Sequence, residues 1–142
     1  MSAFRDISIA LNQRVQTYAV AASRDVAYEN ISYIPTTGKP FIRPTVLPVD
    51  TTQAGLGKNG QELHEGIFQI DVFYPVDTPN ALVLDEADAI ANHFARGLTL
   101  TYNGVNVRIG TTSVGSGNRE NVWYQIPVSI NYHSFTHARP TP

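Results

Sequence analysis

Alternating apolar and polar positions predict a central β-strand from Gly66 to Pro75. Apolar side chains occupy every second position, which is the period of a strand with one buried face, at Phe68, Ile70, Val72 and Tyr74. The intervening positions form a mixed face that consists of Ile67, Gln69, Asp71 and Phe73. Pro75 lacks the amide proton that a ladder needs, so we expect it to end the strand.

Two segments have helical spacing instead. In residues 3–20, Ser2 is a candidate N-cap and the apolar stripe consists of Phe4, Ile7, Leu11, Val15 and Tyr18. In residues 81–96, Gly97 is a natural C-cap and the stripe consists of Leu84, Ala87, Ile90, Ala91 and Phe94. Acidic residues in the first half of this second helix match the helix dipole, and we expect them to be solvated: Asp85, Glu86 and Asp88.

Between the first helix and the central strand, the sequence predicts two more strands. Residues 26–35 indicate a short strand, and residues 41–49 indicate a longer one. Pro44 and Pro48 fall on the same side of the longer strand, which is typical of an edge strand or of a ribbon that leaves the sheet. Residues 50–60, rich in Thr, Gly and Asn, predict a loop.

A hairpin follows the second helix. Asn103-Gly104 separates two apolar runs, 98–102 and 105–109, and a type I′ turn needs positive φ at both of its central residues. We therefore expect these runs to pair as antiparallel strands. The Gly-, Ser- and Thr-rich residues 110–121 predict a long loop.

Alternation in residues 122–132 predicts the last strand, in which Pro127 indicates a bulge or an edge. We expect residues 136–142 to be a mobile tail. No repeat or internal boundary is visible, so a single domain over residues 1–142 is predicted. From the residues alone, the central strand is expected to be part of a sheet that carries a helix.

Composition narrows the classes of partner. Charged residues make up only 15% of the chain, against about 25% in an average soluble domain, which favours a surface partly hidden in an assembly. The net charge of −2 without a basic cluster argues against specific nucleic-acid binding. Cysteine is absent, so neither a disulfide nor a thiolate site is available. No apolar run suits a signal peptide or a membrane span, and we expect a product made in the cytoplasm.

The sequence contains no convincing catalytic or metal-binding pattern. His64 lies near Glu62 and Glu65, but residues 64 and 65 point to opposite faces of a strand. The glycine string from Gly55 to Gly60 precedes a strand, whereas a dinucleotide site needs a helix after it. We therefore predict no catalytic residue, no metal site, no cofactor and no enzymatic activity.

The order of these elements resembles the tail terminator (tail completion) proteins of long-tailed bacteriophages. The likeness covers nearly the whole chain and consists of apolar positions with a few marker residues, not of a catalytic signature. Beyond the first helix, it is carried by Ala27-Tyr28-Glu29-Asn30, Gly38-Lys39-Pro40-Phe41-Ile42-Arg43, Gly66-Ile67-Phe68-Gln69-Ile70-Asp71-Val72, the helix end at Phe94 to Gly97, and Trp123 to Tyr132.

The resemblance implies an α+β fold, in which a mostly antiparallel β-sheet packs against two α-helices and an extended ribbon and loop, residues 41–65, make contacts between subunits. It also implies a homohexameric ring on the head-proximal end of the phage tail tube. Such a ring stops tube polymerisation and presents the surface to which the head connector docks, while DNA passes through without specific recognition. The implied partners are the chain itself, the tail tube protein and the head–tail connector, with assembly in the host cytoplasm and a final place in the virion. A ring needs a heterologous interface. The candidate residues for a subunit or tube interface are Arg43, Lys58, Asn59, Glu62, Arg108 and Arg119.

Three other functions are compatible with the sequence. One is another ring protein of the head–tail connection. A second is a small-ligand or glycan-binding module, with Trp123 and the tyrosines as stacking platforms. The third is a hydrolase that uses His64 with Glu62 or Glu65.

Overall fold

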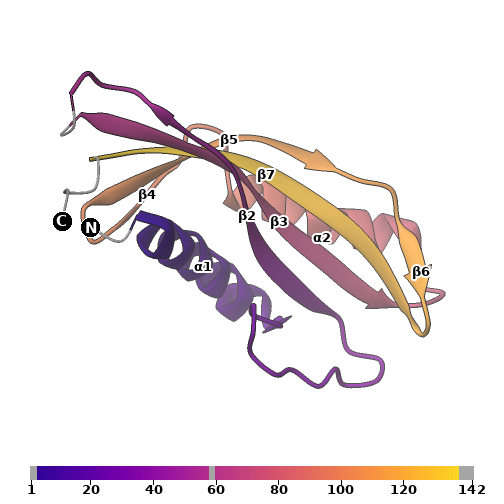
Figure 1. Ribbon diagram of the computed structural model, residues 1–142. Coiled ribbons are helices and arrows are strands. Elements are labelled where there is room, and N and C mark those ends of the chain that lie inside the picture. The colour runs from indigo at the N-terminus through magenta and orange to yellow at the C-terminus, as the bar shows by residue number, and fades with distance from the viewer. Residues whose placement is uncertain (1–2, 58–59, 138–142) are drawn as a thin grey trace.

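The computed structural model describes residues 3–57 and 60–137. Two helices and a long, curled, mostly antiparallel sheet form the α+β architecture that the sequence predicts (Figure 1). In chain order the elements are α1 (Ala3–Ala22), β1 (Asp25–Val26), β2 (Phe41–Gln53), β3 (Gln61–Pro75), α2 (Asn80–His93), β4 (Thr99–Tyr102), β5 (Val105–Val114), β6 (Asn118–Glu120) and β7 (Trp123–His137).

The predicted central strand is β3, which lies inside the sheet. The strand order is β1-β2-β3-β7-β5-β4, and the short β6 pairs with β7 beside β5. Every pair is antiparallel except β1 with β2. Pairing to both β2 and β7 runs along most of β3, so this strand holds the two halves of the sheet together.

Both helices cover the same face of the sheet. That face of β3 carries Phe68, Ile70 and Val72, which are at most 1% exposed, and the partly buried Tyr74. The main core joins them to residues of α1, α2, β2, β5 and β7, among them Leu11, Val15, Ile42, Ile90, Val107 and Ile130. The predicted alternation of β3 is therefore confirmed, and it fixes which face is the core.

The opposite face of β3 has no helix over it. At one end, Phe73 stacks on Phe41 with ring centroids 4.5 Å apart, and Trp123 meets Phe41 edge-on at 5.1 Å. Ala27 and Tyr33 from the segment after β1 complete this small cluster. Toward the other end, Ile67 and Gln69 are only partly covered. We call the whole face of the sheet opposite to the helices, which includes these residues of β3, the open face.

A buried polar network joins the two helices to β3. Glu86 of α2 accepts hydrogen bonds from the hydroxyls of Tyr18 in α1 and Tyr74 in β3 (2.8 Å for Tyr74), and pairs with Arg24 at 2.5 Å. Its side chain is only 4% exposed. The expectation that Glu86 is solvated is therefore wrong, because partners remote in sequence bury this carboxylate.

Both helical stripes also differ in detail from the prediction. Phe4 and Leu84 are exposed, at 47% and 38%, whereas Val83 and Asp6 are buried. Asp6 accepts a hydrogen bond from Asn103 Nδ2 (3.3 Å), which ties the first turn of α1 to the β4–β5 turn. The α2 helix ends at His93 instead of residue 96, and Phe94 becomes its C-cap.

Several strand boundaries are corrected by pairing that the local sequence does not reveal. Of the predicted strand 26–35, only Val26 lies in a strand, which is β1, and β2 continues into the predicted loop as far as Gln53. The predicted loop 110–121 contains the end of β5 and all of β6, because both pair with β7. The last strand runs to His137, so residues 136–137 are not a tail, and residues 138–142 lie outside the described residues.

The turn signal at Asn103-Gly104 and the proline signal at Pro127 have different outcomes. Asn103 and Gly104 both have positive φ, which confirms the hairpin. Pro127 causes no shift in the β3–β7 register, and its strand is internal. Its carbonyl accepts from the Gly115 amide (2.9 Å), so the side without an amide proton faces the place where the partner of β7 changes from β5 to β6.

We predict that Glu86→Ala lowers the free energy of unfolding by about 3–5 kcal/mol, because it leaves the largely buried Arg24 guanidinium without its carboxylate. The matched control is Asp85→Ala, which removes an exposed acid from the adjacent position of the same helix and should change stability by about 0.5 kcal/mol or less. Urea denaturation measures both. Equal effects of the two substitutions would contradict the role assigned to Glu86.

The same network predicts alkaline sensitivity. Burial and the hydrogen bond to Glu86 raise the pKa of Tyr74 to about 12, above the value of about 10 for an unfolded chain. The stabilisation from the neutral phenol is thus complete below about pH 10 and lost as pH rises through the folded-state pKa. Urea denaturation at several pH values in this window should show a falling stability, with a shallower fall in Tyr74→Phe. Parallel curves for the two proteins would contradict this prediction.

Candidate oligomerisation surface

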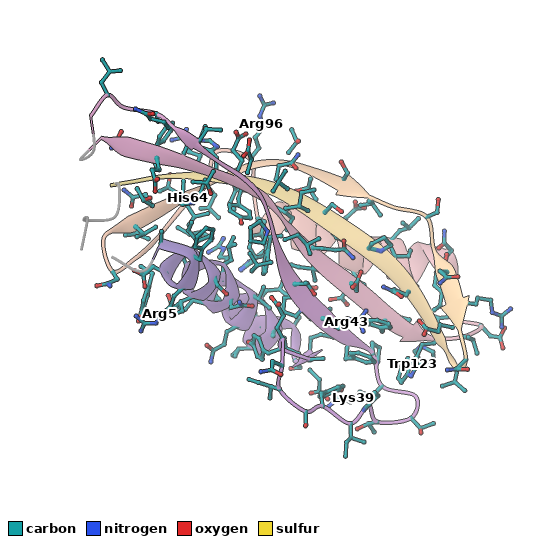
Figure 2. All side chains as sticks on the ribbon, viewed as in Figure 1. Arg5, Lys39, Arg43, His64, Arg96 and Trp123 are labelled. Atoms are coloured by element: carbon teal, nitrogen blue, oxygen red, sulfur yellow. The ribbon has the colours of Figure 1, made fainter. Side chains whose placement is uncertain are left out.

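The predicted interface residues do not form one patch. Glu62 and Arg108 lie near the end of the sheet where β2 and β3 connect, Arg43 lies at the start of β2, and Arg119 lies on β6 at the opposite end. Figure 2 shows the same separation, with Arg43 and Trp123 toward one end and His64 toward the other. Lys58 and Asn59 lie outside the described residues.

Arg43 is held within its own chain. Its guanidinium lies 3.3 Å from Asp71 of β3 and 4.9 Å from the centre of the Phe73 ring. Asp71 is buried, and it also accepts a hydrogen bond from Gln69 Nε2 (2.9 Å). Arg43 therefore neutralises a buried carboxylate on the open face, and its role at an interface remains a prediction.

The other charged candidates are more exposed. Arg119 lies 3.6 Å from Asp77, with side chains 66% and 86% exposed, and such a surface pair contributes little stability. Glu62 lies on β3 between Gln53 and Thr136, and Arg108 lies on the open face between Thr99 and His133. A cavity of about 430 Å³ beside Arg108 and His133 is also lined by Gln61.

His64 is a buried packing residue. Its ring nitrogens lie 3.2 Å from Thr51 Oγ1 and 2.8 Å from Thr136 Oγ1, and the Phe4 ring meets it edge-on at 5.2 Å. Glu62 is 4.0 Å away. In residues 3–57 and 60–137, no three His, Asp or Glu side chains gather in a way that could hold a metal ion. His64 therefore joins β2, β3 and β7 to the start of α1.

Trp123 is not a free stacking platform, because it packs against Phe41 in the small aromatic cluster. An open cavity of about 500 Å³ lies elsewhere, between the outer side of α1 and the segment after β1. Its lining consists mainly of uncharged polar side chains, including Asn12, Gln13 and Gln16, together with Ile9, Ile31, Glu29 and Tyr28. Tyr28 is the one aromatic residue of this lining, so the cavity lacks the set of stacking platforms that the glycan hypothesis invokes.

The outer edge of β2 is blocked over its first half. The Ala27 amide donates to the Ile42 carbonyl (2.8 Å), and the Val46 amide donates to Glu29 Oε1 (2.9 Å). The even-numbered residues of this stretch therefore direct their backbone groups away from β3. Pro44 and Pro48 belong to the same set and have no amide proton to offer. Because β1 pairs only with Phe41 and Ile42, β2 is the outermost strand at both prolines, as the sequence signal predicts.

Beyond Pro48, the pairing and the exposure of β2 change. The β2–β3 register shifts between Pro48 and Asp50, after which β2 has no proline up to its end at Gln53. All β2 residues from Leu47 onward are exposed. We call residues 49–53 of β2, residues 61–65 of β3 and the described part of their connection the β2–β3 tip, which projects at one end of the sheet in Figure 1.

Apolar side chains are exposed at and near this tip. Val49 is 66% exposed and Leu56 is 96% exposed, while Leu47 and Phe135 on the neighbouring part of the open face are 40% and 49% exposed. Apolar exposure on an edge is a liability for a monomer and is expected where another chain covers it. Leu47, Val49 and Leu56 lie within the ribbon and loop from which contacts between subunits are expected, whereas Phe135, on the last strand, is not among the expected interface residues.

Gly66 fixes the base of the tip. A Cβ atom at this position would lie 2.4 Å from the Tyr132 hydroxyl and 2.8 Å from the Leu47 carbonyl oxygen. The Tyr132 ring thus crosses β3 in the space that a side chain would fill, and β2 approaches from the other side. The glycine allows the three strands to stay in register where the tip begins.

The fold thus belongs to a class of α+β proteins in which both helices cover one face of a curled sheet and the other face has no helix over it. No helix in the described chain is long and apolar enough to span a membrane. A family model described as phage tail terminator protein matches residues 6–132, and the chain belongs to this family. Its role is therefore a structural one, in the tail of the phage particle.

Solved structures share the architecture at low sequence identity. One, a protein without a descriptive name, is 22% identical with a TM-score of 0.74, covering 96% of this chain and 95% of its own. Another belongs to the virion of a native gene transfer agent particle and is 13% identical with a TM-score of 0.63, covering 96% and 99%. At these identities the likeness shows the fold. No curated protein matches the chain.

Proposed function

We propose that this chain caps the head-proximal end of the phage tail tube as a hexameric ring. The ring stops addition of tube subunits and offers the surface to which the head connector docks. The observation that carries this proposal is membership of the tail terminator family over residues 6–132. A neighbour in fold that comes from a virion particle supports the same place of action.

The open face of the sheet supplies the lining of the ring, and the helices face outward. Across its middle, a row of paired residues consists only of uncharged polar side chains: Thr45, Gln69, Ser129 and Ser113. Arg43, beside this row, is already paired with Asp71. Affinity for DNA comes mainly from cations that neutralise phosphates. A lining of hydroxyl and amide groups therefore lets DNA pass without holding it.

Loss of the gene tests the capping function. In a phage whose copy carries an early stop codon, we expect tails of abnormal length that do not join filled heads, because tube growth has no terminator. A plasmid copy of the wild-type gene should restore both length and joining, which provides the control. Electron microscopy of lysates measures tail length and attachment. Tails of normal length joined to heads in the uncomplemented mutant would overturn the proposal.

The orientation of the open face has its own test. Ser129→Lys places one new cation per subunit on the open face, whereas Asn92→Lys adds the same charge to the exposed side of α2. We expect both variants to assemble tails, but only Ser129→Lys to slow DNA release, with a defect that weakens as salt concentration rises. The measurement is DNA release from purified particles. Equal release rates in the two variants would place the open face away from the DNA.

A further inference from the structure

Free strand edges remain on both sides of the sheet, at β2 beyond Pro48 and at β4. Four antiparallel steps separate these strands, through β3, β7 and β5, so β2 and β4 run in the same direction. In the described chain, no strand lies outside β4 and none lies outside β2 beyond its first two residues. An unpaired edge is a template for a strand from another chain.

The β4 edge carries none of the usual protection. Its four residues, Thr99 to Tyr102, include no proline and no charged side chain. The Leu98 carbonyl accepts from the Ile109 amide (2.8 Å), so residues of even number face β5 and Thr99 and Thr101 direct their backbone groups outward. The hydrogen bond between Asn103 and Asp6 fixes the hairpin on α1. This edge is both open and rigidly held.

The two free edges lie at the same level of the sheet. One row of paired residues crosses the sheet from β2 to β4 through Asp50, Glu65, His133, Arg108 and Thr99. Asp50 begins the unblocked stretch of β2, and Thr99 begins β4. When β4 of a neighbouring copy is added beside β2, residues 99–102 lie next to residues 50–53. Closure of a barrel adds a stagger between the two strands.

Charge along this row is polarised. Its β2 side carries Asp50 and Glu65, whereas its β4 side carries the exposed Arg108. A head-to-tail contact therefore places Arg108 of one copy on the same face as Asp50 of the next, two strand spacings away across Thr99 (about 10 Å between backbones), which a long arginine side chain can span. A contact between two different surfaces of the same chain is the heterologous interface that closes a ring.

We propose that the outer edge of Asp50–Gln53 binds β4 of the adjacent copy as a parallel strand, with Arg108 of that copy paired to Asp50. The partner is thus a second copy of this chain, and the repeated contact turns separate sheets into a continuous barrel. Pro44, Pro48 and the Glu29 contact confine pairing to the tip, because they leave no free amide along the rest of the outer edge. This inference rests on the proposed ring.

Cysteine cross-linking tests the contact, since the natural chain has no cysteine. The pairs Thr52→Cys with Thr101→Cys, Thr52→Cys with Thr99→Cys, and Asp50→Cys with Thr101→Cys cover staggers of up to about two residues either way. We expect at least one pair to give a ladder of disulfide-linked oligomers on capped tubes. The control, Thr52→Cys with Ser113→Cys, joins two exposed positions that the proposal keeps apart and should give no ladder.

Charge exchange adds a test that leaves the core untouched. Arg108→Asp should raise the protein concentration needed for ring formation by about tenfold, and Asp50→Arg in the same chain should restore it. Both side chains are exposed, so folding is expected to persist, and circular dichroism checks this. Rings on tube ends without any cross-linked pair and without charge rescue would overturn the strand contact but keep the capping function. Tubes that remain uncapped with the wild-type chain would instead refute the capping function.

Discussion

The buried carboxylate of Glu86 is the interaction on which the arrangement of layers depends. A charge removed from water is tolerated only when it is paired and hydrogen-bonded. Glu86 meets this condition through Arg24 just after α1, Tyr18 within α1 and Tyr74 on β3. These contacts draw both helices onto one face of the central strand. The other face is left without a helix, and that asymmetry gives the subunit a surface for a second role.

Sequence predicted those features whose cause is local. The alternation of β3 identified its buried face, Asn103-Gly104 identified the hairpin, and two prolines identified the edge strand. Features with distant causes were missed. Glu86 was expected in solvent because its ion-pair partner, Arg24, lies 62 residues away in sequence. The end of β5 resembles a loop in composition and becomes a strand only because β7 is beside it.

The solved structures with this fold also explain why the apolar pattern was a better guide than individual residues. They share the architecture at 22% and 13% identity, so the same layers form with most side chains different. The charged interface candidates show the converse. Arg43 and Arg119 each have a partner within their own chain, and single charged residues in a sequence do not reveal whether such a partner exists.

Pro48 marks the boundary between the part of β2 that serves the fold and the part that is available to another chain. Before it, the Ile42 carbonyl is bonded to Ala27, the Val46 amide is bonded to Glu29, and Pro44 has no amide proton. After it, the register shifts and the strand continues, exposed, to Gln53. A long edge without such blocks would pair at many registers, because strand pairing has little intrinsic specificity. Blocking all but a short stretch restricts a neighbour to one position, and a ring closes only when every contact has the same geometry.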